Sequence, residues 1–100
     1  MSRANKIRNA FKRQKNQKNK IEEIKDFIRN DNYAIHKHFV KRFKQREFTH
    51  RDVRRIIFDG KPTFSYNSRV VFKWKKYGVV IEFNDKENGK ILNIKLITIF

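Results

Sequence analysis

Apolar residues recur at helical spacing in the N-terminal half of the chain. The first stripe consists of Ile21, Ile24, Phe27 and Ile28. Because the i, i+3, i+6, i+7 spacing places these side chains on one side of a helix, the stripe predicts a core helix. A second helix is expected from about Tyr33 to Arg46. A third, short helix is expected to begin with the capping-box pair Thr49 and Asp52 and to end at Gly60.

After Pro62 the apolar pattern changes from a period of 3.6 to a period of 2, which is typical of strands. Four strands are expected, at roughly 63–67, 69–76, 79–84 and 90–100. The dipeptides Tyr77-Gly78 and Asn88-Gly89 fall at the last two junctions, where a residue with positive φ suits a tight hairpin turn. An antiparallel meander is the simplest topology for these strands.

The second of these strands separates its residues by face. Val70, Phe72 and Trp74 point one way, and Arg69, Val71, Lys73 and Lys75 point the other. One face of the sheet is therefore expected to be apolar and covered by the helices, and the opposite face to be largely cationic. The sequence predicts an α+β fold in which N-terminal helices pack on one face of a four-stranded antiparallel sheet.

Charge narrows the range of partners. The 100-residue chain carries 26 Lys and Arg against ten Asp and Glu, a formal net charge of +16. Residues 1–20 hold eight of these cations and no acid, which indicates a basic arm ahead of a single domain over residues 21–100. A solvated tail without a specific role is the alternative for the arm. Such a charge excess opposes folding through self-repulsion, so it points to a polyanionic partner: nucleic acid, an anionic membrane or an acidic protein.

Several classes of protein are excluded by what the sequence lacks. No stretch approaches the 18 uninterrupted apolar residues of a membrane span, and the basic N-terminus is not followed by the apolar segment of a signal peptide. Cysteine is absent, which excludes disulfides and Cys-ligated metal sites. We expect a protein that acts in the cytoplasm and uses no cofactor.

His38, Arg42 and Arg46 are spaced i, i+4, i+8 and therefore form one stripe along the second expected helix. RNA can be cleaved without a metal, because its own 2′-hydroxyl attacks the adjacent phosphorus once a base accepts the proton and cations stabilise the phosphate charge. Imidazole titrates near neutral pH and guanidinium binds phosphate as a planar fork. These three residues are thus a suitable set for RNA cleavage.

Two other interpretations of the same residues stay open. The two arginines can be part of a generally basic surface, with His38 at its boundary, since such spacing arises easily in so basic a chain. A zinc site formed by His36, His38 and His50 is the other, although the usual ligand spacing is missing and His36 falls on a different side of the helix.

From His38 to Gly60 the chain reads His-x3-Arg-x3-Arg, a short turn, Asp-Val and Gly. This pattern resembles an uncharacterised bacterial family grouped with the RelE-like toxins and, more loosely, with the barnase/EndoU/colicin/RelE ribonuclease fold. The resemblance covers about residues 35–100, including the closing Thr98-Ile-Phe100. It implies helices on a small antiparallel sheet, metal-independent RNA cleavage, and neutralisation by an acidic antitoxin or immunity protein.

The positions that match this family are His38, Arg42, Arg46 and Thr98, which the resemblance therefore marks as the catalytic set. Phe100 stands where the family can have a tyrosine, so a phenolic hydroxyl is missing there and Tyr66 is the substitute. Without the resemblance, Thr98 would be an ordinary strand residue at the edge of the core. Strand alternation places it on the even-numbered face with Leu92, Ile94, Leu96 and Phe100, turned towards the helices.

Further residues are candidates for binding RNA. Lys73, Lys75 and Lys95 lie on expected strands and suit contacts to the RNA backbone, although ordinary solvated lysines explain them equally well. Tyr66 and Trp74 can stack on bases, and core packing is their alternative role.

These observations favour a toxin-like endoribonuclease that acts on tRNA, mRNA or ribosome-bound message and leaves a 2′,3′-cyclic phosphate. A non-catalytic RNA- or DNA-binding module is the alternative, in which the arginines hold phosphate and His38 is incidental. A third possibility is an interaction protein whose cationic surface binds an acidic partner.

Overall fold

The computed structural model describes residues 17–65 and 68–100. The prediction of a basic arm therefore falls mostly outside the described residues, and so does the candidate Tyr66. The described chain begins with a helix over residues 17–29. The elements that follow are β1 (Ala34–Ile35), α2 (Lys37–Gln45), α3 (His50–Asp59), β2 (Lys61–Ser65), β3 (Arg69–Trp74), β4 (Tyr77–Asp85) and β5 (Ile91–Ile99).

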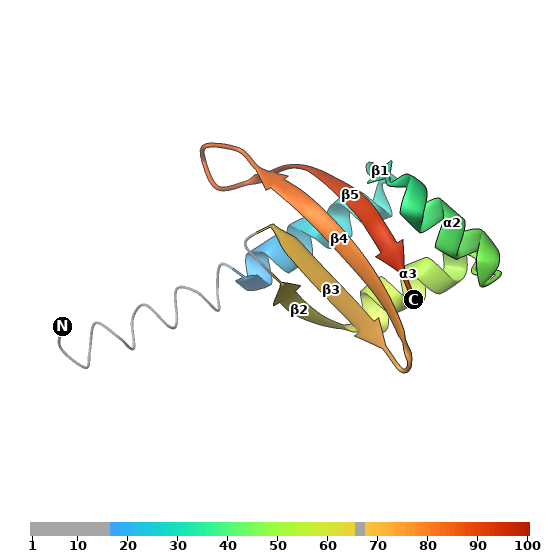
Figure 1. Ribbon diagram of the computed structural model, residues 1–100. Helices are drawn as coiled ribbons and strands as arrows, with labels where there is room; N and C mark the ends of the chain where they lie inside the picture. The colour runs from blue at the N-terminus through green and yellow to red at the C-terminus, as the bar shows by residue number, and fades with distance from the viewer. Residues whose placement is uncertain (1–16, 66–67) are drawn as a thin grey trace.

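The strands form one five-stranded sheet in the order β1-β5-β4-β3-β2 (Figure 1). β2, β3, β4 and β5 make the expected antiparallel meander, whereas β1 pairs with β5 in parallel. The α+β class is thus confirmed. The prediction of a four-stranded antiparallel sheet is wrong, because the sheet has a fifth strand, β1, which is parallel to its neighbour. Ala34 and Ile35 pair with Lys95 and Leu96. A strand of two residues is too short to show a period of 2, so the sequence pattern predicts these positions as part of the following helix.

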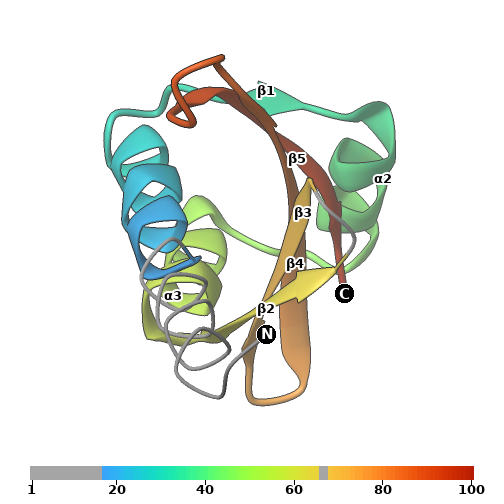
Figure 2. The same cartoon turned by 90° about the vertical axis from the view of Figure 1, so that its left-hand side faces the viewer.

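The helices lie on both sides of the sheet (Figure 2). Helix 17–29 and α3 are on one side, where α3 contacts β3 and β4. α2 lies on the other side, beside β5, which it contacts. The expectation that the helices share one face therefore holds for two of them. Among the residues of α2 only Phe39 is buried, and its side chain joins the core.

The core fills the space between the sheet and the first and third helices. Its members, all below one tenth exposed, are Ile21, Ile24, Ile28, Phe39, Val53, Ile56, Ile57, Val70, Phe72, Val79, Ile81, Phe83, Ile91, Ile94, Leu96 and Ile99. The predicted apolar side of β3 is thus confirmed by Val70 and Phe72, and the stripe of the first helix by three of its four residues. No charged or polar side chain is buried among the described residues.

The ends of α3 form as predicted. Thr49 Oγ1 accepts the Asp52 N–H at 3.2 Å and Asp52 Oδ2 accepts the Thr49 N–H at 2.8 Å, so the capping box is complete. Gly60 ends the helix in an extended conformation, with φ −78°. A side chain is excluded there because a Cβ would lie 2.0 Å from the Ile56 carbonyl oxygen.

Only one of the two expected turn dipeptides lies in its turn. Gly89 has φ 81° in the β4–β5 connection, as predicted. The β3–β4 turn is instead Lys75-Lys76, with Lys75 at φ 55°, and Gly78 lies within β4. Gly78 is required there for space, because a Cβ would come within 2.4 Å of the Phe100 ring.

The alternation of β5 is broken twice. Register shifts occur between Val80 and Ile81 and between Asn84 and Asp85 of its partner β4. The buried residues of β5 are consequently Ile91, Ile94, Leu96 and Ile99, with spacings of three, two and three. Leu96 pairs with the buried Ile81, whereas Thr98 pairs with Val80, which points to the opposite face. The expectation that Thr98 shares the face of Leu96 is therefore wrong.

Candidate nucleic-acid interface

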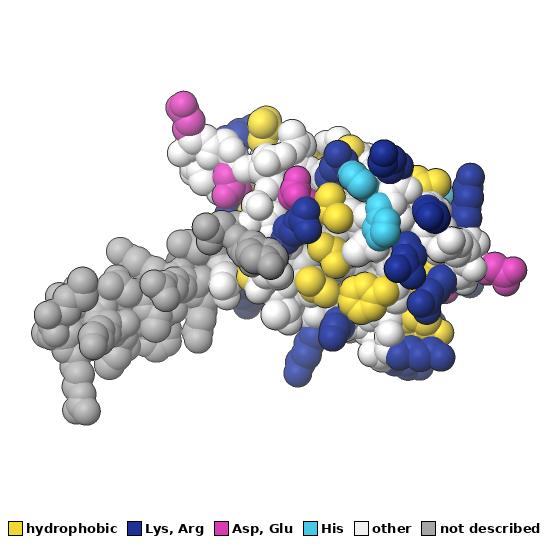
Figure 3. All heavy atoms as spheres, viewed as in Figure 1, with side chains coloured by type: hydrophobic (Ala, Val, Ile, Leu, Met, Phe, Trp, Pro, Cys, Tyr) yellow, Lys and Arg dark blue, Asp and Glu magenta, His cyan; other side chains and the backbone are white. Residues whose placement is uncertain are grey.

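The sheet face opposite to the core is here called the outer face, and it faces the viewer in Figures 1 and 3. Strand alternation and pairing register place Lys61, Thr63, Ser65, Arg69, Val71, Lys73, Gly78, Val80, Glu82, Asn84, Asn93, Lys95, Thr98 and Phe100 on it. Val71, Val80 and Phe100 are apolar residues at these positions. Figure 3 shows apolar side chains on this face with Lys and Arg side chains around them. The outer face is therefore cationic with an apolar middle, as the pattern of β3 predicted.

Glu82 is the one acidic residue at an outer-face position of the described strands. Its Oε2 accepts hydrogen bonds from both Nε and Nη2 of Arg69 at 3.2 Å, so this charge is paired. Lys61, Lys73 and Lys95 take part in none of the ion pairs between described residues. Their positive charge is consequently available to a phosphate backbone.

The stripe of His38, Arg42 and Arg46 borders the outer face. On one flank of α2, Val40 and Lys44 line an apolar cavity of about 220 Å³ together with Val53 and Leu96 from the core side. Residues of a helix advance by about 100° each, so His38, Arg42 and Arg46 occupy the other flank. Histidine side chains and several Lys and Arg lie together where α2 meets β5 in Figure 3. His38 and Arg46 are exposed and Arg42 is half-buried.

Both ends of α2 are fixed by local hydrogen bonds. His36 is the N-cap, and its Nδ1 accepts the His38 N–H at 3.1 Å. At the other end Glu47 adopts a left-handed φ of 56°, its N–H donates to the Lys44 carbonyl, and Phe48 N–H donates to the Phe43 carbonyl. This pair of bonds is a Schellman motif. Both ends of the helix that carries the stripe are therefore capped, and the role of His36 is that of the N-cap.

Thr98 reaches the same side of the molecule through the β5 bulge. It pairs with Val80 and is half-buried on the outer face, and Lys95 lies on this face in the same strand. The four residues that the resemblance marks are thus brought to one side, with Thr98 on the strand that α2 contacts. A period of 2 cannot reveal this placement, because the bulge reverses the facing of everything after it.

Of the remaining candidates, one lies on the outer face, one in the β3–β4 turn and one against the core. Lys73 is exposed on the outer face, as expected. Lys75 is in the β3–β4 turn and not on a strand, and its Nζ lies 4.5 Å from the centre of the Trp74 ring. Trp74 is half-buried and packs against the core, which agrees with its alternative role.

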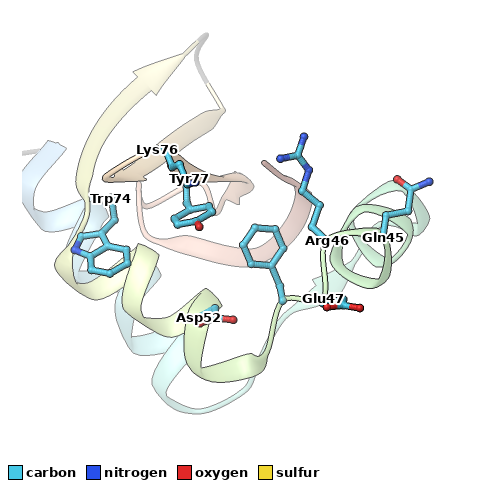
Figure 4. A pocket seen from close by; sticks show the side chains of 8 residues that line it. Gln45, Arg46, Glu47, Asp52, Trp74, Lys76 and Tyr77 are labelled. Atoms are coloured by element: carbon cyan, nitrogen blue, oxygen red, sulfur yellow. The ribbon is translucent and has the colours of Figure 1, made fainter.

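A cavity of about 680 Å³ lies at the end of the sheet, next to the C-terminal end of α2 (Figure 4). It is lined by Gln45, Arg46, Glu47, Phe48, Asp52, Trp74, Lys76 and Tyr77. Arg46 is the member of the stripe that lines it. Thr98 lies on the outer face and His38 and Arg42 border it, and these three residues do not line this cavity.

Within residues 17–65 and 68–100, no group of three His, Asp or Glu side chains is arranged to hold a metal ion. His36, His38 and His50 in particular form no such group; the His50 ring lies 5.8 Å from that of Phe43, beside the apolar cavity. None of the helices in the described part of the chain has the length and apolar character of a membrane span.

The chain matches no family model, and neither a curated protein nor a solved structure matches it.

Proposed function

We propose that this protein is a toxin-like endoribonuclease that binds RNA on the outer face and cleaves it beside α2. One observation carries the proposal: the flank of α2 with His38, Arg42 and Arg46 borders the face that presents Thr98 and the unpaired lysines. A single strand of RNA laid along this face would contact cations on both sides of an exposed imidazole.

Each group has a role that its chemistry allows. The His38 imidazole takes the proton from the 2′-hydroxyl while the 2′-oxygen bonds to phosphorus. The bond from phosphorus to the 5′-oxygen breaks, and the imidazolium returns the proton to that oxygen, which leaves a 2′,3′-cyclic phosphate. Arg42 and Arg46 stabilise the charge on the non-bridging oxygens, and the Thr98 hydroxyl donates a hydrogen bond to the phosphate.

A non-catalytic nucleic-acid-binding module is the second candidate, and the openness of the site favours it. His38 and Arg42 lie on a surface, and the cavity of about 680 Å³ meets the stripe only at Arg46. Phosphate binding needs only the cations, whereas efficient cleavage needs groups that converge on one phosphate. In either case an acidic inhibitor protein, which the family resemblance implies, would be attracted to the same cations.

The two candidates are separated by replacing His38 with alanine and measuring cleavage and affinity on the same RNA. His50→Ala is the matched control, because His50 is also exposed and lies beside the apolar cavity on the other flank of α2. For a nuclease, His38→Ala lowers the cleavage rate by about 10²–10⁴-fold with affinity nearly unchanged, and His50→Ala changes neither. If the wild-type protein binds RNA and never cuts it, the binding module is the correct assignment.

A further inference from the structure

The cavity at the end of the sheet has walls that suit a flat heterocycle. Three of its lining residues are aromatic: Phe48 from the loop before α3, and Trp74 and Tyr77 from the β3–β4 hairpin. The Phe48 and Tyr77 rings meet edge to face, with their centres 5.6 Å apart. Figure 4 shows the rings of Trp74 and Tyr77 around a hollow, with Asp52 on its lower side and the Tyr77 hydroxyl directed into it. A volume of about 680 Å³ falls within the usual range of small-molecule sites.

Two cations, Arg46 and Lys76, and two acids, Glu47 and Asp52, line the cavity, and Arg46 connects it to the stripe on α2. Arg46 lines the cavity and is also the last residue of the stripe, and Lys76 lines it from the hairpin turn. A phosphate bound by Arg46 would therefore place one of its neighbouring nucleotides at the mouth of the cavity. The cations at the mouth of the cavity suit the phosphate backbone of RNA, and the aromatic side chains that line the cavity suit a base.

The Asp52 carboxylate determines which hydrogen-bonding groups a ligand of this cavity should present. Its Oδ2 already accepts the Thr49 N–H at 2.8 Å as part of the capping box, which fixes the carboxylate, and its Oδ1 is in no hydrogen bond between described residues. A carboxylate only accepts, and its two oxygens have about four lone-pair sites. It therefore selects a base edge that presents N–H donors.

We propose that this cavity binds the guanine base of an RNA nucleotide next to the phosphate held by Arg46. The proposal rests on the proposed binding of RNA at the outer face. Guanine presents two adjacent donors, N1–H and the N2 amino group, to the Asp52 carboxylate, and its O6 accepts from the Tyr77 hydroxyl. Uracil presents one N–H between two carbonyl oxygens, which a carboxylate repels, and adenine and cytosine each present one amino group beside a ring acceptor.

The chain provides its own reporter for this site. Trp74 is the only tryptophan among the 100 residues and lines the cavity, so quenching of its fluorescence reports on binding there. The four ribonucleoside 5′-monophosphates carry the same phosphate and differ only in the base. We expect saturable quenching by guanosine 5′-monophosphate, and binding of the uridine nucleotide at least about tenfold weaker.

The decisive variant is Asp52→Asn, and its matched control is Asp59→Asn. Asparagine keeps an oxygen for the Thr49 N–H, so the N-cap hydrogen bond is retained. Its other group is an NH₂ donor, which would face the N–H donors of guanine and could not accept from them. Asp59 lies at the far end of the same helix, is exposed, and does not line the cavity, yet its replacement changes the net charge equally. Its ion-pair partner Arg55 lies 5.6 Å from the centre of the Trp74 ring, so the quenching of each variant is measured relative to its own fluorescence without nucleotide. Asp52→Asn should weaken the binding of guanosine 5′-monophosphate about tenfold and leave the affinity for the uridine nucleotide unchanged. Asp59→Asn should resemble wild type.

The outcomes keep this proposal separate from the proposed function. Equal quenching by all four nucleotides, or equal effects of the two asparagine variants, would overturn the guanine site even where the protein cleaves RNA. A guanine preference that depends on Asp52, in a protein that never cleaves RNA, would support the site and refute the nuclease. Thermal unfolding of both variants shows whether the capping box survives, and Tyr77→Phe, which removes only the hydroxyl, gives an independent loss of guanine preference if Asp52→Asn fails to fold.

Discussion

Replacing Arg42 and Arg46 by glutamine tests whether RNA follows the flank of α2 that borders the outer face. The matched control replaces Lys41 and Lys44, which belong to the same helix and lie on its other flank or its exposed back. Both double variants remove two positive charges from α2 and its C-cap residue Arg46. The two double variants therefore have the same net charge, and they differ only in the side of the helix from which the charges are removed.

The expected magnitude follows from counterion release. Each phosphate neutralised on a single strand contributes about −0.7 to the slope of log K against log salt. Five cations of the interface are unpaired among the described residues, namely Arg42, Arg46, Lys61, Lys73 and Lys95, and together they contribute up to about −3.5 to the wild-type slope. Loss of two contacts makes the slope shallower by about 1.4, which is a loss of affinity of about 25-fold at 0.1 M salt for proteins that bind equally at 1 M.

The assay is fluorescence anisotropy of a labelled 2′-O-methyl oligonucleotide, which cannot be cleaved because its 2′-oxygen is blocked, over a series of potassium chloride concentrations. The arginine variant should show the shallower slope and the lysine variant a slope near that of wild type. Equal losses in both variants would refute the assignment of the interface, because binding would then depend on net charge alone.

The local contacts that hold α2 and the end of β5 in place can be tested by thermal unfolding of single variants. His36→Ala should cost about 1 kcal/mol through loss of the N-cap, and His36→Asn should restore most of it; equal losses would contradict the capping role. Glu47→Gly should stabilise the fold by about 0.5–1 kcal/mol, because glycine adopts the left-handed conformation without strain, and a loss of stability would contradict this. Gly78→Ala should cost about 1 kcal/mol by displacing the Phe100 ring, and a second change, Phe100→Ala, should remove that penalty; a penalty that persists would contradict the contact.

Much of the fold could be predicted because its signals are local. The stripe that begins at Ile21, the capping box of Thr49 and Asp52, and the alternation of β3 each depend on neighbours within one turn or strand. β1 could not be predicted, because two residues carry no period and their pairing depends on β5, about sixty positions away.

The candidate site was predictable in part for the same reason. The spacing of His38, Arg42 and Arg46 places them on one flank of a helix wherever that helix packs. The facing of Thr98 depends on a bulge in the pairing of β5 with β4, which alternation within one strand cannot show. The capping role of His36 could not be predicted, because serine, threonine, aspartate and asparagine usually fill the N-cap position and here an imidazole does so.

Metal-independent cleavage of RNA is tested by incubation of the purified protein with an end-labelled RNA in the presence of EDTA, followed by mass analysis of the fragments. Cleavage by attack of the 2′-hydroxyl predicts fragments that end in a 2′,3′-cyclic phosphate, and no product from the same oligonucleotide when the scissile nucleotide is 2′-deoxy. An RNA left intact, or one cut at the 2′-deoxy position, would contradict the account.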